Sequence, residues 1–85
     1  MSNEKRLPRA AALHDLSCVG RCALTVILPT LAAMGIQPIP LPTALLSTHT
    51  GGFGKPVVTH LTGNMLAMAE HWKAAEIRFD AILVG

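Results

Sequence analysis

The segment STHTGGFGKP, residues 47–56, carries more chemistry than a connecting loop needs. It places three hydroxyl side chains, one histidine and three glycines between an apolar run and a proline. Glycines let the backbone approach a ligand closely, while His and Thr side chains donate and accept hydrogen bonds in the plane of a flat polar ring. The segment is therefore predicted to bind a small polar molecule, with four candidate contact residues: Ser47, His49, Thr50 and Gly51.

A second polar group lies near the start of the chain, in RAAALHDLSCVGR, residues 9–21. An apolar run there leads into His14, Asp15 and Ser17, and then into a Val19-Gly20 turn. The run is predicted to form a strand over residues 9–15, with its loop after it. Asp15 and Ser17 are also suited to cap the following helix or to brace the loop, so both interpretations stay open for them.

Lys55, at the end of the glycine-rich segment, invites comparison with a phosphate-binding P-loop. That pattern requires Gly, four residues, and then Gly, Lys and Ser or Thr. His49 stands at the position of the first Gly, and Pro56 stands at the position of the hydroxyl residue. The segment is therefore not a P-loop.

A metal or redox module is an alternative of a different class, and it would use His14, Cys18, Cys22 and His49. The first three follow an H-x3-C-x3-C pattern, which differs from the C-x2-C pairs of structural zinc sites. The apolar stretch 10–13 is too short for an export signal, so we expect a cytoplasmic protein without a structural disulfide. Neither cysteine is given a role.

The composition limits the class of protein. The chain has 85 residues, of which 51% are apolar and 14% are charged. A chain of this length cannot hide so many apolar side chains by itself, so we expect a fragment of a larger domain or an obligate assembly. The net charge of +2 and the few aromatic residues do not favour a nucleic-acid partner. The longest apolar run, residues 22–36, is shorter than the roughly 18 residues of a membrane span, so no membrane partner is expected.

The first half of the chain predicts a tail, a strand and a helix. Residues 1–9 are expected to form a flexible basic tail, and residues 10–85 to form part of one domain. A helix is predicted over residues 22–35, because Gly35 suits the left-handed conformation that ends a helix. Pro29 loses the hydrogen bond to the carbonyl of Thr25, so a kink is expected there.

The segment IQPIPLPTALLS, residues 36–47, is predicted to be a strand with one unusual edge. Its prolines alternate with other residues, so their missing N–H donors all fall on the same lateral side. The first half of the strand should therefore pair on one side only. From residue 43 to residue 46 the donors return on both sides. The three prolines are Pro38, Pro40 and Pro42.

The last part of the chain predicts a helix and a strand. Residues 61–76 carry apolar side chains at helical spacing, with Thr62 or Asn64 available as an N-cap. The apolar positions are Met65, Met68, Ala69 and Trp72. The run FDAILVG, residues 79–85, is typical of a buried parallel strand.

The order strand, helix, strand, helix, strand, without signals for tight hairpin turns, predicts a parallel sheet of an α/β fold. In such sheets ligands bind beyond the carboxyl ends of the strands. The two polar groups described above follow the first and second strands. They are therefore expected to meet at one edge of the sheet.

From about residue 10 to its end, the sequence resembles the opening of a bacterial pyridoxal or pyridoxamine kinase of the ribokinase superfamily. The likeness runs through HDLSCVGRCALTVILPTLAAMGIQPIPLPTALLSTHTGGF and HWKAAEIRFDAILVG. The S-x-H-T-G segment, Ser47 to Gly51, and the Val19-Gly20 turn are together fairly specific for vitamin B6 kinases and their hydroxymethylpyrimidine kinase relatives. The implied fold is the N-terminal part of a ribokinase-like α/β sandwich with a parallel sheet.

This resemblance implies an enzyme that phosphorylates the hydroxymethyl group of pyridoxal, pyridoxamine or pyridoxine with magnesium ATP. It implies that the polar residues after the first strand line the pyridine pocket and that an apolar wall follows them. The residues implied there are His14, Asp15, Ser17 and Val19. His49 and Thr50, in the S-x-H-T-G segment, are implied to lie against the ring and its phenolic oxygen.

The resemblance leaves two substrate classes open. Asp15 also matches an acidic residue of the pyrimidine kinases, so a hydroxymethylpyrimidine or phosphomethylpyrimidine kinase of thiamine synthesis is the alternative. Arg21 stands where many pyridoxal kinases carry Asn, and it is given no role. A homodimer is implied for the full-length protein.

The nucleotide site of this family lies in its C-terminal half, with a Gly-x-Gly-Asp segment whose Asp activates the substrate hydroxyl. No such segment occurs in these 85 residues, so no catalytic residue is assigned. We expect this chain alone to bind neither ATP nor Mg²⁺ and to be inactive. The further alternative is an inactive remnant, which would expose the strand at residues 81–84 and aggregate.

Overall fold

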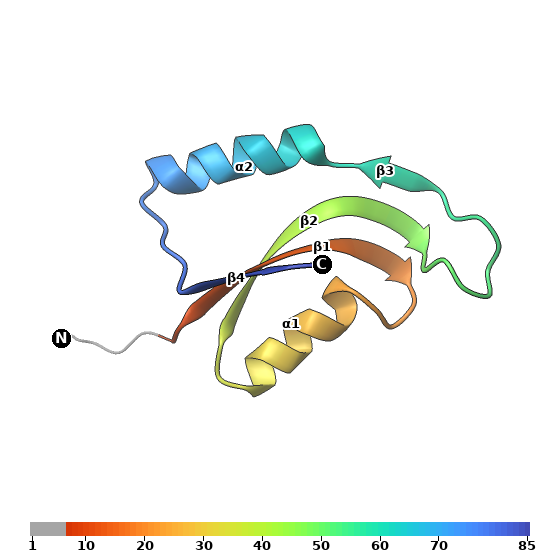
Figure 1. The fold of residues 1–85 in the computed structure, drawn as a ribbon, viewed down its shortest axis with the longest axis horizontal. Helices are drawn as coiled ribbons and strands as arrows, with labels where there is room; N and C mark the ends of the chain where they lie inside the picture. The colour runs from red at the N-terminus through yellow and green to blue at the C-terminus, as the bar shows by residue number, and fades with distance from the viewer. Residues whose placement is uncertain (1–6) are drawn as a thin grey trace.

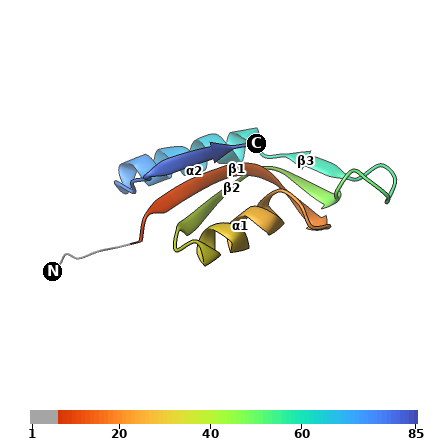
Figure 2. The same ribbon diagram turned by 60° about the horizontal axis from the view of Figure 1, so that its bottom comes forward.

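The computed structural model describes residues 7–85, which form one curved sheet flanked by two helices (Figure 1), with overall extents of 52 × 29 × 15 Å. The strands are β1 (Arg9–Val19), β2 (Gln37–Thr48), β3 (Val58–His60) and β4 (Ala81–Val84), and their order in the sheet is β3-β2-β1-β4. The helices are α1 (Leu24–Ala33) and α2 (Thr62–Ala74). Figure 2 shows the two helices on opposite sides of the sheet.

The predicted strand and helix order is confirmed, with one addition. β1 pairs in parallel with both β2 and β4, as expected where helices connect the strands. The addition is β3, a short strand that pairs antiparallel with the end of β2. This strand was not predicted. Its β-branched residues favour a strand, but three residues are too few to show the alternation of apolar and polar side chains by which a strand is recognised.

β1 is longer than predicted, because it continues to Val19 instead of ending near Asp15. Ala10, Ala11 and Ala12 are at most 3% exposed, which is typical of a strand covered on both faces. The polar residues that were expected to follow this strand therefore lie within it. Their side chains alternate between its two faces.

A bulge in β2 sets which of its side chains are buried. His14 pairs with Pro42 and Leu16 with Leu45, so two residues of β2 stand opposite the single residue Asp15. The extra residue shifts the alternation of side chains by one position. As a result the buried residues of β2 are spaced by three and then by two: Leu41, Ala44 and Leu46.

α1 packs against β1 and β2 and buries Leu24 and Leu31. It continues through Pro29, whose side chain is exposed. Gly35 has a φ of +79°, and the N–H of Ile36 donates to the carbonyl of Leu31 at 3.0 Å. The predicted helix end at Gly35 is confirmed, while a kink at Pro29 stays a prediction.

The one-sided pairing predicted for the first half of β2 is confirmed. The N–H of Gln37 donates to the carbonyl of Pro8 at 2.8 Å, on the β1 side. Alternation then directs the three proline positions to the other edge, which has no strand partner in residues 7–85 until Ala44 pairs with His60. The prolines therefore keep this half-edge poor in donors, which hinders pairing with another chain.

Replacing Pro38, Pro40 and Pro42 together by Thr is expected to make the protein self-associate. The change returns three N–H donors to an exposed edge and raises its β-propensity. Size-exclusion chromatography with light scattering should show higher oligomers than the parent at equal concentration. Pro56→Thr, which changes a loop proline outside this edge, is the control and should not associate. A triple variant as dispersed as the parent would contradict this role for the prolines.

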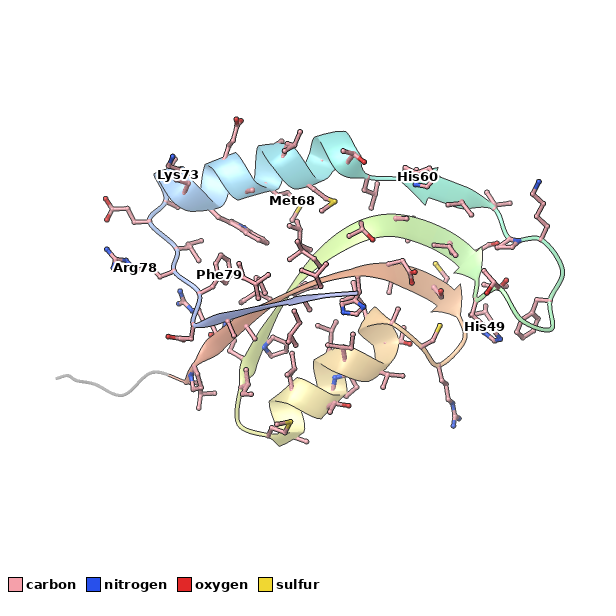
Figure 3. The ribbon with its side chains drawn as sticks, in the orientation of Figure 1. His49, His60, Met68, Lys73, Arg78 and Phe79 are labelled. Atoms are coloured by element: carbon pink, nitrogen blue, oxygen red, sulfur yellow. The ribbon has the colours of Figure 1, made fainter. Side chains whose placement is uncertain are left out.

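α2 and β4 differ from prediction in burial. α2 begins after Leu61 without a side-chain cap, so neither Thr62 nor Asn64 is its N-cap. It buries none of its residues, and β4 exposes all four. The rings of Trp72 and Phe79 lie 5.3 Å apart between centroids, where Figure 3 shows Phe79 beside the end of α2.

Two expectations concern the chain ends and membranes. Residues 1–6 of the predicted basic tail lie outside the described residues, and Arg9, also expected in the tail, is the first residue of β1.

Within residues 7–85, no helix combines the length and the apolar character needed to cross a membrane.

Candidate functional site

The carboxyl ends of β1 and β2 lie side by side, as predicted, and bring the two polar groups into contact. Val19 pairs with Thr48, and the main-chain N–H of His49 donates to the carbonyl of Val19 at 3.0 Å. The turn after β1 and the glycine-rich segment after β2 therefore begin next to each other, and this hydrogen bond holds their first residues together. Figure 3 shows His49 at this end of the sheet.

Gly20 and His49 pack against each other without a gap. Gly20 has a φ of +139°, a conformation that essentially only glycine adopts. A Cβ on Gly20 would collide with Nδ1 of His49 and lie 3.0 Å from its Cγ. Gly20 is therefore required both by its backbone conformation and by the space that the imidazole occupies.

Thr25 fastens the turn that contains Gly20 to the start of α1. Its hydroxyl donates to the carbonyl of Cys22 at 2.7 Å and accepts from the Cys22 N–H at 3.0 Å. The carbonyl of Gly20 lies 3.3 Å from the same hydroxyl. Ala23, between them, has a φ of +52°, which is strained for a residue with a side chain. The position of Gly20 is thus set by bonds within the turn as well as by β1.

The imidazole of His49 is surrounded on three sides. Its ring meets the ring of Phe53 edge to face, with centroids 5.0 Å apart and planes at 81°. Its Nδ1 is buried and has no hydrogen-bond partner in the described residues. A Cβ at Gly51 would lie 3.7 Å from Cδ2 and 4.0 Å from Nε2, which is ordinary contact. The imidazole of His49 is therefore packed against Gly20, Gly51 and Phe53, although it lies on a loop.

Ser47, one of the predicted contact residues, closes the base of the glycine-rich segment. Its N–H donates to the carbonyl of Val57 at 2.9 Å, and its hydroxyl accepts from the Val57 N–H at 2.9 Å. These two bonds join the ends of the loop that carries His49. Ser47 therefore has a clear structural role, and any contact with a ligand stays a prediction.

Ser47→Ala is expected to loosen the loop without unfolding the sheet. It removes one of the two bonds that close the loop, at a cost of about 1 kcal/mol locally. Amide hydrogen exchange of Val57 should become severalfold faster. Thr50→Ala, which removes an exposed hydroxyl of the same loop, should leave that exchange rate unchanged. Equal rates in Ser47→Ala and the parent would show that the hydroxyl does not hold the loop.

The predicted group in β1 is divided between two faces of the strand. Alternation places Asp15, Ser17 and Val19 on one face and His14 on the other. The His14 ring lies directly against Gly85, after β4. The expectation that His14 stands with Asp15 and Ser17 after the strand is wrong, because β1 extends past all three.

The residues on the first face differ in exposure. Ser17 is 1% exposed and pairs with the buried Leu46, so it is closed to a ligand in this structure. Asp15 is partly buried opposite the bulge of β2, and Val19 is 52% exposed at the strand end. The residues that the structure brings together are therefore Val19, His49 and Gly51, with the exposed Thr50 between the last two.

Sequence reasoning did not assign Gly20, Thr25 or Phe53 to the site. A Thr three residues after Cys22 is a partial signal of a helix start, and it was available in the sequence. The need for glycine at position 20 and the place of Phe53 depend on where the His49 ring lies. No spacing pattern reveals that.

The site has little charge and no enclosed volume in the described part of the chain. Arg21 and Lys55 are exposed, and residues 7–85 form no pocket. Those residues also contain no group of three or more His, Cys, Asp or Glu side chains that could hold a metal ion. Cys18 and Cys22 are free thiols. What the site offers is hydrogen-bond donors and acceptors beside an aromatic ring and an apolar side chain.

Solved structures of kinases share this fold. A Bacteroides thetaiotaomicron protein, assigned provisionally as a phosphomethylpyrimidine kinase and crystallised with pyridoxal, is 45% identical, with a TM-score of 0.89 over 94% of this chain and 28% of its own. Pyridoxal kinase from Lactobacillus plantarum is 41% identical, with a TM-score of 0.86 over 95% of this chain and 29% of its own. These matches confirm the predicted resemblance and the ribokinase-like fold class.

More distant structures agree in fold. Pyridoxal kinase from Leishmania donovani, in complex with ADP and pyridoxamine, is 18% identical, with a TM-score of 0.77 over 91% of this chain and 28% of its own. The chain spans less than a third of the length of each of these structures and matches the N-terminal part of their fold. No protein-family model and no curated protein matches the chain.

Proposed function

We propose that this chain, which matches pyridoxal kinases and a phosphomethylpyrimidine kinase in fold and sequence, is the N-terminal part of a vitamin B6 kinase. The observation that carries the proposal is the 45% identity to a structure that was crystallised with pyridoxal. The reaction is the transfer of a phosphoryl group to the 5'-hydroxymethyl group of pyridoxal, pyridoxamine or pyridoxine. Residues 10–85 would be part of the single kinase domain, which also forms the homodimer in the cytoplasm.

The residues at the ends of β1 and β2 supply one wall of the proposed substrate site. His49 and Thr50 offer hydrogen bonds to a planar ring, and Val19 offers an apolar contact beside them. Gly51 leaves room for the ring to approach the backbone. Asp15 lies further back on the same face of β1. Contact by His14, on the opposite face, stays a prediction of the resemblance.

This chain's residues do not fit the nucleotide and metal that such a kinase uses. Phosphoryl transfer relies on charge stabilisation by metal ions and by oriented donors. Residues 7–85 place no acidic cluster for Mg²⁺, and the glycine-rich segment has His49 where a P-loop needs Gly. ATP and Mg²⁺ are therefore assigned to the rest of the proposed protein, and no step is derived through them.

The proposal is tested by kinetics of the full-length protein. Pyridoxal, pyridoxamine, pyridoxine and hydroxymethylpyrimidine are assayed separately with magnesium ATP. A kcat/KM that is highest for a B6 vitamer supports the proposal. The second candidate is a phosphomethylpyrimidine kinase, which the assignment of the Bacteroides thetaiotaomicron protein favours. A preference for the pyrimidine by tenfold or more, about 1.4 kcal/mol, would favour that candidate instead.

The 85-residue chain by itself should form no pyridoxal 5'-phosphate from pyridoxal and magnesium ATP. It contains one wall of the proposed site and lacks the Gly-x-Gly-Asp segment that the family uses to activate the hydroxyl. The full-length protein, assayed at the same concentration, is the control. ATP-dependent product formed by the purified 85-residue chain would contradict this division of the site.

A further inference from the structure

We propose that the outer side of α1 is the surface through which two copies of the full-length protein associate. The inference rests on the proposed function only for the existence of a homodimer, to which it adds the face and the residues of contact. The contact is centred on four residues that we call the α1 stripe: Pro29, Thr30, Ala33 and Met34. None of them belongs to the candidate substrate site.

α1 has a second apolar side, beyond the one with which it packs on the sheet. Leu24 and Leu31 are buried where the helix contacts β1 and β2, and helical spacing places the α1 stripe on the opposite side. All four stripe residues are exposed, Met34 to 66%. A helix that is apolar all round is typically covered all round. Residues 7–85 cover only one side of α1.

The hydroxyl in the α1 stripe is already paired. Thr30 donates it to the carbonyl of Val26 at 2.7 Å, within the helix. The side chains of Pro29 and Ala33 have no hydrogen-bonding atom. A partner therefore covers the stripe without leaving a side-chain donor unpaired, which is the cost that burial of a polar helix face would carry.

The absence of charge on α1 fits a second copy of the same chain. No Asp, Glu, Lys or Arg occurs between Arg21 and Lys55. A twofold axis brings the same patch of both copies together, so a patch of one charge would face its own repulsion. A neutral apolar patch meets itself without that penalty. α2, on the other side of the sheet, carries Glu70 and Lys73 at exposed positions and is less suited to this contact.

The topology leaves the outer side of α1 open to a partner. α1 leads from β1 to β2, and α2 leads back past β1 to β4. Right-handed crossovers that run in opposite directions lie on opposite sides of a sheet, as Figure 2 shows for these helices. A crossover that extends the sheet beyond β4 runs in the direction of α2, so its helix lies on the side of α2. Such an extension in the full-length protein does not cover the α1 stripe.

The size of α1 makes the stripe the centre of an interface and not the whole of it. The helix has 10 residues and is therefore about 15 Å long, whereas a standard interface buries roughly 800 Å² on each partner. The small side chain of Ala33 suits the point where two helices cross, because short side chains there allow close axes. Val26, one turn before Thr30, lies at the rim.

The inference is tested by the mass of the full-length protein in solution, from size-exclusion chromatography with light scattering. The parent is expected to be a dimer. Thr30→Glu and Thr30→Lys are each expected to be monomers, because each brings like charges together across the axis. An equal mixture of these two variants should form dimers again, since their charges are opposite. Glu70→Lys, which changes a charge on α2, is the control and should stay dimeric.

A monomeric parent, a Thr30→Glu variant as dimeric as the parent, or a mixture that stays monomeric would overturn the inference. Met34→Ser removes apolar surface without adding charge, so it serves even where a charged variant fails to fold. It is expected to raise the Kd of the dimer about tenfold on dilution, and an unchanged Kd would also overturn the inference. These measurements use no substrate, so their outcome is separate from that of the kinase assay.

Discussion

Gly20→Ala is expected to lower the free energy of unfolding of the full-length protein by roughly 2 to 6 kcal/mol. Two costs combine at this position. A φ of +139° is strained for any residue with a side chain, at about 1 to 3 kcal/mol. The new methyl group must also displace the imidazole of His49, and overpacking of this kind costs about 1 to 3 kcal/mol. Urea unfolding followed by circular dichroism measures the sum.

Gly35→Ala is the matched control for this prediction. Gly35 also has a positive φ, at +79°, but a Cβ there would meet nothing within 4 Å. Its substitution should cost only the backbone strain, about 1 to 2 kcal/mol. Gly20→Ala should also lower the kcat/KM of the proposed kinase, because His49 must move, whereas Gly35→Ala should not. Equal destabilisation by the two variants would mean that His49 does not occupy the space beside Gly20.

Leu24→Ala is expected to destabilise the protein by about 2 to 5 kcal/mol, the range for a buried leucine in a close-packed core. Leu24 is 1% exposed and is the first residue of α1, where that helix packs against β1 and β2. The variant leaves a cavity below the turn that Thr25 holds. Looser packing there should also make the Cys22 amide exchange faster, because its bond to Thr25 depends on the position of α1.

Val26→Ala, two residues further along α1, provides the comparison. Val26 is 44% exposed, so its truncation should cost well under 1 kcal/mol beyond the change in helix propensity. Thermal unfolding of both variants separates a packing effect from a general effect of alanine in this helix. A Leu24→Ala variant as stable as Val26→Ala would show that α1 is not anchored through Leu24.

The order of the helices and strands followed from local chemistry. Gly35 ends α1 because glycine takes a positive φ without a steric penalty, and that requirement is visible in the sequence. The three alternating prolines predicted a strand with few N–H donors on one edge, because a proline has no backbone N–H in any conformation. The S-x-H-T-G segment and the Val19-Gly20 turn pointed to the kinase family, since the two motifs together are fairly specific in residue types and spacing.

The exposure of α2 and β4 could not be predicted from the local sequence pattern. Their apolar residues have the spacing of a core helix and a buried strand, yet the structure leaves Leu66 65% and Ile82 63% exposed. A hydrophobic period shows which face of an element is apolar, and not whether the chain contains anything to cover it. The matched kinase structures are more than three times as long as this chain.

The sequence by itself determined the fold class, the family resemblance and the choice of the segment around His49 as a candidate binding segment, because these depend on residue types at fixed spacing. The tertiary structure decided which of those residues meet. The length of β1 placed His14 and Ser17 on opposite faces, and the bulge opposite Asp15 reset the alternation of β2. Only packing between two strand ends, which no local pattern encodes, brought Gly20 against His49 and closed one side of its ring.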